Sequence, residues 1–353
     1  MSKLAAGAQM LAEIHEQPEA IRRLLAAESA RVWELGDRWA HTPPRFIAIA
    51  ARGTSDHAAL YGKYLFETIN RIFVGLAAPS VASIYHADVN LDGALVVGIS
   101  QSGEAADVIT VLEHARRSGA QTLALTNVAS SPLAAAAETT IELHANPELA
   151  VAATKTFTTT MAALLMLAAA MHRDAALRDA LQRLPDLIAD VLAQEAAITA
   201  KVERFRFLQE CVVLGRGYNL ATAYELALKL RETSYIRAQP FASPDFVHGP
   251  IAILEEGYPV LAFANEGATL PTVLEVLLQT KGRGAETVVF GNAPAALDLA
   301  DVAFPLNPGT DVPEVLSPFT SITAGQLFAC TLATIKGYNP DAPRGLRKVT
   351  ITR

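Results

Sequence analysis

Short apolar stretches of this chain occur twice, at an offset of about 164 residues. Three pairs of stretches match in the same order along the chain: 46–53 with 210–217, 92–99 with 256–263, and 118–127 with 283–292. The last pair is offset by 165 residues, because one residue is inserted ahead of it in the second half. Three matches at one spacing indicate an internal duplication, so the fold must be built from two similar units.

Each half reads as strand, turn and helix in alternation, an order typical of α/β proteins. The apolar runs do not alternate with polar residues, which indicates strands buried on both faces of a parallel sheet. We therefore predict two doubly wound α/β domains, each with a sheet between two layers of helices. The expected parts are N-terminal helices over 1–45, a first domain over 46–195, a second over 200–335, and an extended tail over 336–353.

The composition argues against several classes of function. With 29 basic and 36 acidic residues the net charge is −7, which argues against a broad nucleic-acid surface. The run Met161–Met171 is shorter than the roughly 20 apolar residues that a membrane span needs, so we expect a buried helix and no membrane. Two cysteines suit a reducing cytosol, and the eight histidines lack metal-ligand spacing. We expect a cytoplasmic protein without a metal or cofactor.

A turn rich in serine and glycine, Ser100-Gln-Ser-Gly-Glu104, follows the apolar run 93–99. Its hydroxyl groups can donate hydrogen bonds, and its glycine lets the backbone approach a ligand closely. Residues 106–113 read as a helix whose first N–H groups would point at whatever the serines hold. The pattern predicts a phosphate cradle. In the second half Glu266 stands at this place and would repel a phosphate, so one cradle is expected.

The second half carries charged residues on one face of a predicted helix. Glu225, Lys229 and Glu232 are spaced by four and three residues, which places them together, away from the apolar stripe. From spacing alone, a solvated face with surface ion pairs and a catalytic face are equally good interpretations. His248 follows in a turn, where a histidine is more often structural than catalytic.

In these residues the chain resembles proteins with tandem SIS (sugar isomerase) domains. It is most similar to the isomerase half of the glucosamine-6-phosphate synthases and to the related SIS-type deaminases. The matching pieces follow the family's order: Arg52-Gly-Thr-Ser55, Ser100-Gln-Ser-Gly-Glu104, Val151-Ala-Ala-Thr-Lys155, Glu225-Leu-Ala-Leu-Lys-Leu-Arg-Glu232, His248-Gly-Pro250 and Pro343-Arg-Gly-Leu-Arg-Lys348. They span the chain from about residue 50 to its C-terminal tail. The resemblance implies a sugar-phosphate substrate and a homodimer that shares its site between subunits.

The resemblance also implies a role for each matching residue. Glu232 would be the base that moves a proton between C1 and C2, and Lys229 would assist it, which leaves Glu225 mainly structural. His248 would open the sugar ring, in this family often from the neighbouring subunit. Lys348 would contact the open-chain carbonyl, with a Schiff base as one form of that contact. Six residues would bind the sugar or its phosphate: Thr54, Ser55, Ser100, Gln101, Ser102 and Val151.

Three positions depart from the synthase pattern. Ala105 replaces a threonine after the cradle, Arg347 replaces a small residue before the tail lysine, and residues 245–247 are bulky. The synthases also begin with a glutaminase domain that has a nucleophilic cysteine, and this sequence shows none. We therefore expect an activity that does not use glutamine. The first choice is interconversion of glucosamine 6-phosphate with fructose 6-phosphate and ammonia.

Other functions stay open at this point. An aldose–ketose isomerase, or a deglycase acting on amine-linked sugar phosphates, would use the same residues. A sugar-phosphate sensor without catalysis would have no need for Glu232, His248 and Lys348 together. A dinucleotide site at Gly215-Arg-Gly217 is disfavoured, because Leu220 stands where the third glycine of that motif belongs.

Overall fold

Two parallel sheets of five strands organise the chain in the computed structural model, which describes residues 5–348. The first sheet contains β1 (Phe46–Ala50), β2 (Val74–Leu76), β3 (Ala94–Ile99), β4 (Gln121–Thr126) and β5 (Thr139–Glu142). The second contains β6 (Glu210–Gly215), β7 (Arg237–Ala242), β8 (Pro259–Phe263), β9 (Glu286–Gly291) and β10 (Val302–Pro305). The strand orders are β2-β1-β3-β4-β5 and β7-β6-β8-β9-β10. The second sheet repeats the first strand for strand, which confirms the predicted duplication and fold class.

The chain divides into two units, one around each sheet. The first unit comprises residues 17–148, 155–185 and the tail from 347; the second comprises the N-terminal residues through 16, then 149–154 and 186–346. This division differs from the expected parts at the N-terminus. Helix α1 (Ala8–His15) belongs to the second unit and α2 (Gln17–His41) to the first. Pro18 stands in the first turn of α2, where its missing N–H costs no helical hydrogen bond.

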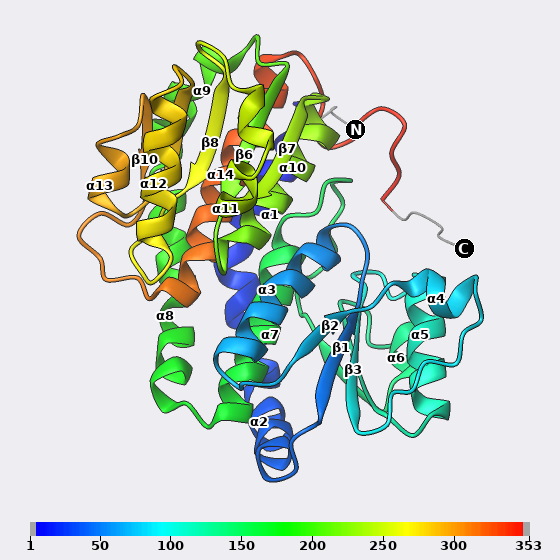
Figure 1. Cartoon of the computed structure of the whole chain (residues 1–353). Helices are drawn as coiled ribbons and strands as arrows, with labels where there is room; N and C mark the ends of the chain where they lie inside the picture. The colour runs from blue at the N-terminus through cyan, green and yellow to red at the C-terminus, as the bar shows by residue number, and fades with distance from the viewer. Residues whose placement is uncertain (1–4, 349–353) are drawn as a thin grey trace. The chain divides into compact units, whose positions relative to one another are not determined.

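In the first unit the sheet lies between two groups of helices (Figure 1). One group contains α2, α3 (Thr54–Thr68) and α7 (Lys155–His172), and the other contains α4 (Pro79–Ser83), α5 (Ala106–Arg117) and α6 (Pro132–Ala136). All residues of α7 except His172 are buried, as expected for a helix that is apolar on every side. The buried helix predicted over Met161–Met171 is thereby confirmed. Helix α8 (Ala175–Leu192) leads into the second unit.

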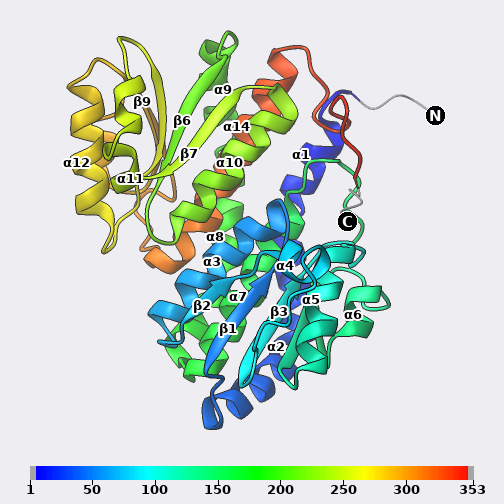
Figure 2. The same cartoon turned by 45° about the vertical axis from the view of Figure 1, so that its right-hand side comes forward.

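The second unit has the same layers (Figure 2). On one side lie α9 (Glu195–Val202), α10 (Asn219–Ser234) and α14 (Ser317–Ile335), and on the other α11 (Ser243–Val247), α12 (Leu270–Lys281) and α13 (Pro294–Leu297). Three short 3-10 turns, η1 (Glu203–Phe205), η2 (Pro250–Ile253) and η3 (Glu314–Leu316), complete the connections. The segment Glu314–Ile335 has the length and hydropathy of a membrane span, but 89% of its apolar window is buried inside the protein. Such burial is typical of a core helix.

The described tail, residues 336–348, contains turns and bends but no helix or strand, and the last residues of the tail predicted over 336–353 lie outside the described residues. Within the second unit it is held at several points. The Arg344 guanidinium stacks 3.9 Å from the ring centre of Tyr235. The Asp341 carboxylate accepts hydrogen bonds from the backbone N–H groups of Gly7 (3.1 Å) and Met10 (2.8 Å). Asp341 therefore caps the N-terminus of α1 from the far end of the chain.

Candidate active site

The order of the first sheet changes direction between β1 and β3, which lie side by side. In parallel α/β sheets this point opens a crevice at the carboxyl ends of the strands, and ligands bind there. Residues 51–53 leave β1 at that edge, and residues 100–105 leave β3 beside them. The turn predicted to be a phosphate cradle therefore lies where this fold places its ligands.

The turn itself orders the two serine hydroxyls. The backbone N–H of Gly103 donates to Oγ of Ser100 (3.2 Å), and that of Glu104 donates to Oγ of Ser102 (3.3 Å). Each hydroxyl oxygen accepts from the backbone, so its proton can be donated to a ligand. Gly103 has φ +68°, and a Cβ there would lie 2.1 Å from Oγ of Ser131, so the turn requires glycine.

Two helices begin at this edge without a side-chain cap. Their N-cap residues are Gly53 for α3 and Ala105 for α5, neither of which has a hydroxyl or carboxylate. The uncapped N-terminus of α5 keeps the partial positive charge that favours an anion. A Cβ on Gly53 would meet no atom within 4 Å, so the backbone there borders open space. Thr54 and Ser55, the first residues of α3, are half-buried beside it.

Arg52, to which the sequence analysis gave no role, also places a cation at this edge. Nε of Arg52 donates to Oδ2 of Asp107 in the first turn of α5 (2.7 Å). The Asp107 side chain is fully buried, whereas 48% of the Arg52 side chain is exposed. This contact fixes a guanidinium next to the cradle. Burial raises the pKa of nearby Asp56, although His57 and Arg52 both oppose the rise.

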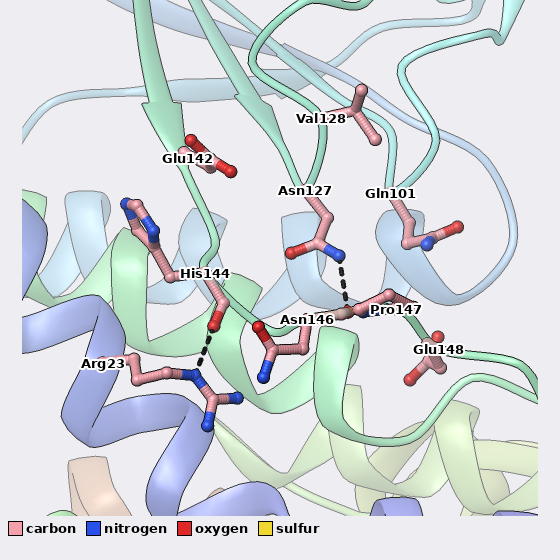
Figure 3. A pocket seen from close by; sticks show the side chains of 9 residues that line it. All are labelled: Arg23, Gln101, Asn127, Val128, Glu142, His144, Asn146, Pro147 and Glu148. Carbon is pink, nitrogen blue, oxygen red and sulfur yellow. Dashed lines mark hydrogen bonds between the residues drawn. The ribbon is translucent and has the colours of Figure 1, made fainter.

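A cavity of about 490 Å³ in the first unit includes the cradle residue Gln101 (Figure 3). It is lined by Arg23, Gln101, Asn127, Val128, Glu142, His144, Asn146, Pro147 and Glu148. Figure 3 shows Gln101 and Glu148 on the same side of it. Nζ of Lys348 donates to Oε2 of Glu148 at 2.8 Å. The tail lysine assigned by resemblance is thus bound to a residue that lines the cavity, and the sequence reasoning did not single out that residue.

The charged face of α10 in the second unit is buried, which corrects the alternative of a solvated face. Side-chain exposure is 0% for Glu225, 1% for Lys229 and 25% for Glu232. Nζ of Lys229 lies 2.7 Å from Oε2 of Glu232 and 3.4 Å from Oε1 of Glu225. Within the described residues, Oε2 of Glu232 accepts no hydrogen bond of good geometry. Its contact with the Lys229 ammonium group is therefore an ion pair. The Lys229 ammonium group therefore lies between two carboxylates of its own helix.

Two further residues assigned by resemblance lie in the second unit. The backbone N–H of Val151 donates to the carbonyl oxygen of Asp341 (3.1 Å), and the Glu13 carboxylate accepts from the N–H of Ala150 (3.3 Å), so both ends of the chain fix this loop. His248 ends α11 with its side chain exposed. Across residues 5–348 its ring makes no hydrogen bond or ion pair, with Glu232 or otherwise.

In the second unit, the position that corresponds to the predicted cradle is occupied by a side chain of the protein, the carboxylate of Glu314. The Glu314 carboxylate accepts hydrogen bonds from the backbone N–H groups of Ala268 (2.8 Å) and Thr269 (3.2 Å) and from Oγ1 of Thr269 (2.6 Å). These groups begin α12, the counterpart of α5. A Cβ on Gly267 would lie 2.3 Å from the Glu314 side chain. An internal carboxylate therefore fills the position in the second unit that corresponds to the predicted cradle of the first.

The fold defines a duplicated α/β protein whose first unit carries a serine-rich turn at the sheet edge where such folds bind ligands. A model of the SIS domain matches residues 43–170 and again 209–336, one match for each sheet. The chain belongs to the SIS domain family. The resemblance first drawn from the motifs is thereby confirmed.

Comparison with individual proteins refines this assignment. The chain is 34% identical to the glutamine–fructose-6-phosphate aminotransferase (isomerizing) of Thermococcus kodakarensis over 348 residues, which cover 96% of this chain and 57% of that protein. It therefore spans a little over half the length of that relative. The C-terminal domain of the Francisella tularensis glucosamine-fructose-6-phosphate aminotransferase is 28% identical, with a TM-score of 0.85 and coverage of 95% and 98%.

A third similar protein is matched over nearly its whole length. A Silicibacter pomeroyi DSS-3 crystal structure, provisionally assigned as a phosphosugar isomerase, is 37% identical and has a TM-score of 0.82. The match covers 94% of this chain and 99% of that one. The likeness thus extends over both sheets and most of the chain.

Proposed function

We propose that this chain interconverts an amino sugar 6-phosphate with a ketose 6-phosphate and ammonia, with glucosamine 6-phosphate as the first choice. The observation that carries the proposal is the pair of Lys229 and Glu232. The Glu232 carboxylate is partly buried and lies 2.7 Å from an ammonium group, so it is held in one position, as a base that transfers a proton requires.

The roles of the groups follow from the chemistry of the reaction. Moving a proton between C1 and C2 passes through an enediol or enolamine, so one carboxylate must alternately take and return that proton. We assign this step to Glu232. Negative charge grows on a substrate oxygen at the same time, and the Lys229 ammonium group is the nearby cation that stabilises it.

The phosphate group gives binding energy far from the reacting carbons. We assign its binding to the hydroxyls of Ser100 and Ser102, the side chain of Gln101, and the first residues of α3, Thr54 and Ser55. The hydroxyl geometry of the turn and the uncapped start of α5 support this assignment. Val151 would contact the sugar, and Lys348 its open-chain carbonyl.

The two thiols in the described chain are poorly suited to act as nucleophiles. Cys211 and Cys330 are both buried, and burial raises the pKa of each thiol to about 12. A thiol in such surroundings stays protonated at neutral pH and is a poor nucleophile. Neither can therefore attack glutamine in the way that the synthases' nucleophilic cysteine does.

We also propose a homodimer in which His248 serves the partner's site. Its exposed side chain at the end of α11 supports this arrangement. The variants Glu232→Gln and His248→Ala should each be inactive alone. Mixing equal amounts and allowing subunits to exchange should restore about a quarter of the activity, because half the dimers would carry one intact shared site. No recovery, with exchange verified by mass, would contradict sharing.

The reaction is tested by incubating the protein with glucosamine 6-phosphate and measuring ammonia and fructose 6-phosphate. Glu232→Gln should lose turnover, and Glu275→Gln, which changes an exposed glutamate on α12, should keep it. Isomerisation of a sugar phosphate without ammonia would favour the aldose–ketose isomerase. Turnover of an amine-linked sugar phosphate alone would favour the deglycase, and binding without turnover would favour the sensor.

A further inference from the structure

We propose that Glu148 positions Lys348 for the reaction, by holding its ammonium group at the cradle cavity. The inference rests on the proposed function, because Lys348 has a chemical task only if the site binds a sugar phosphate. It gives a role to Glu148, which lies three residues before Val151 and outside the motifs of the sequence.

The carboxylate of Glu148 is buried and is fixed by hydrogen bonds that do not involve Lys348. Its side chain is 0% exposed. The backbone N–H of Thr156 donates to Oε1 (3.1 Å), and the hydroxyl of the same residue donates to Oε2 (2.7 Å). Thr156 stands in the first turn of α7, so the carboxylate also lies at the favourable end of that helix dipole. These contacts fix its position and favour its charged form.

The peptide before Glu148 is clamped as well. Nζ of the buried Lys155 donates to the carbonyl oxygen of Pro147 (2.8 Å). The loop is therefore tied to α7 by a lysine and by a threonine that follow each other in the sequence. A carboxylate mounted this firmly offers one position to a cation, which is what a positioning residue requires.

The tail supplies that cation. Nζ of Lys348 lies 2.8 Å from Oε2 of Glu148, and 24% of the lysine side chain stays exposed. A charge-assisted hydrogen bond to a buried carboxylate is stronger than a surface ion pair, because water competes less for either partner. Glu148 and Gln101 line the same cavity, so the pair holds the lysine beside the cradle. There the ammonium group can stabilise negative charge on a carbonyl oxygen of the bound sugar.

The first test measures the contact without using activity. The reaction of Lys348 with acetic anhydride is followed by peptide mass spectrometry in the wild type, in Glu148→Gln and in Glu138→Gln. Glu138 is a matched control, because it accepts a backbone hydrogen bond from Thr122 at the edge of the same sheet and lies outside the cavity. We expect labelling about fivefold faster in Glu148→Gln and unchanged in the control. An unchanged rate in Glu148→Gln would overturn the proposal.

The second test separates positioning from a general loss of structure. If Glu148 acts through Lys348, Glu148→Gln should lower kcat/KM by about tenfold or more in the wild type and by less than about twofold in a Lys348→Met background. Equal losses in both backgrounds would overturn the proposal. If Glu148→Gln does not fold, Thr156→Val removes one hydroxyl contact to the carboxylate and should give an intermediate increase in labelling.

The two tests also distinguish this inference from the proposed reaction. Faster labelling in Glu148→Gln together with no turnover of any sugar phosphate by the wild type would support the contact and contradict the reaction. Turnover by the wild type with unchanged labelling would support the reaction and contradict the role of Glu148.

Discussion

Arg52 and Asp107 join the two loops at the centre of the first sheet: a guanidinium N–H donates a 2.7 Å hydrogen bond to a fully buried carboxylate. The bond ties the loop after β1 to the first turn of α5. It also places a positive charge beside a turn that presents two serine hydroxyls. Ala105, the N-cap residue of α5, has no hydroxyl to offer a ligand, so Arg52 is the charged donor close to this turn.

Replacing Arg52 by glutamine should weaken binding of the phosphate group. A hydrogen bond to a charged group contributes about 1.5 to 3 kcal/mol, so KM for the sugar phosphate should rise at least about tenfold while kcat changes little. Steady-state kinetics and calorimetric binding of inorganic phosphate measure this. Arg45→Gln is the control, because Arg45 precedes the same strand at its opposite end and pairs with Asp92 in solvent. Equal KM values in all three proteins would contradict the role of Arg52.

Replacing Lys229 by methionine should destabilise the second unit as well as abolish turnover. Methionine matches the length of the stem but leaves Glu225 and Glu232 without their cation. Breaking a buried pair in this way costs about 3 to 5 kcal/mol. Urea unfolding at neutral pH measures the change in free energy.

Two further variants test that explanation. Lys63→Met removes the same charge from a half-exposed pair with Glu67 on α3 and should cost less than about 1 kcal/mol. Adding Glu225→Gln to Lys229→Met should restore part of the lost stability, because it removes one of the two carboxylate charges that Lys229 contacts. A double variant less stable than Lys229→Met alone would contradict the assignment of Glu225 as a partner in the cluster.

Replacing Asp56 by asparagine should stabilise the protein at neutral pH. Burial raises the pKa of this carboxyl above its usual value of 3.8, so the folded state binds the proton more tightly than the unfolded state does. Stability is therefore lost as the pH rises from 3.8 through the folded pKa, and asparagine avoids that loss. Thermal unfolding should show a higher Tm for Asp56→Asn at pH 7. The difference should vanish below pH 3.8, and a gain that persists there would have another cause.

The two buried thiols should make the protein sensitive to alkali. Burial raises the pKa of Cys211 from 9.0 to about 12, so the folded state resists ionisation of the thiol. Stability is lost as the pH rises above 9.0, by roughly 2 kcal/mol per such thiol at about pH 10.5.

The matching measurement compares the wild type with Cys211→Ala by urea unfolding at pH 7.5 and pH 10.5. The pH-dependent loss should be smaller in the variant by about 2 kcal/mol, whatever the cost of the substitution itself. At neutral pH a thiol reagent should label neither Cys211 nor Cys330 until the protein unfolds. Rapid labelling of the native protein would show that the thiols are not protected.

The sheets could be predicted because their determinants are local. The apolar runs ending near Ala50 and Ile99 have no alternation, and their repetition near Gly215 and Phe263 requires the same topology twice. The serine-rich turn between β3 and α5 was predictable for the same reason. Strand, turn and helix start follow one another in the sequence, and turn geometry depends on neighbouring residues.

The partners of distant residues could not be predicted in this way. Glu148 binds a lysine that is 200 residues away in the sequence, and no spacing rule relates the two. Glu314 fills the second anion site from a separate turn, whereas the sequence showed only the repulsive Glu266. For α10, helical spacing placed Glu225 with its charged neighbours, but only the packing of the unit decides that this face is buried.

The role of Glu232 as the base in a sugar-phosphate reaction can be tested directly by one measurement. Deuterium exchange at C2 of glucosamine 6-phosphate or C1 of fructose 6-phosphate in heavy water reports the proton transfer itself, even when net turnover is slow. The wild type and Glu275→Gln should incorporate deuterium, and Glu232→Gln should not, although it still binds the sugar phosphate. Exchange by Glu232→Gln at the wild-type rate would contradict the account.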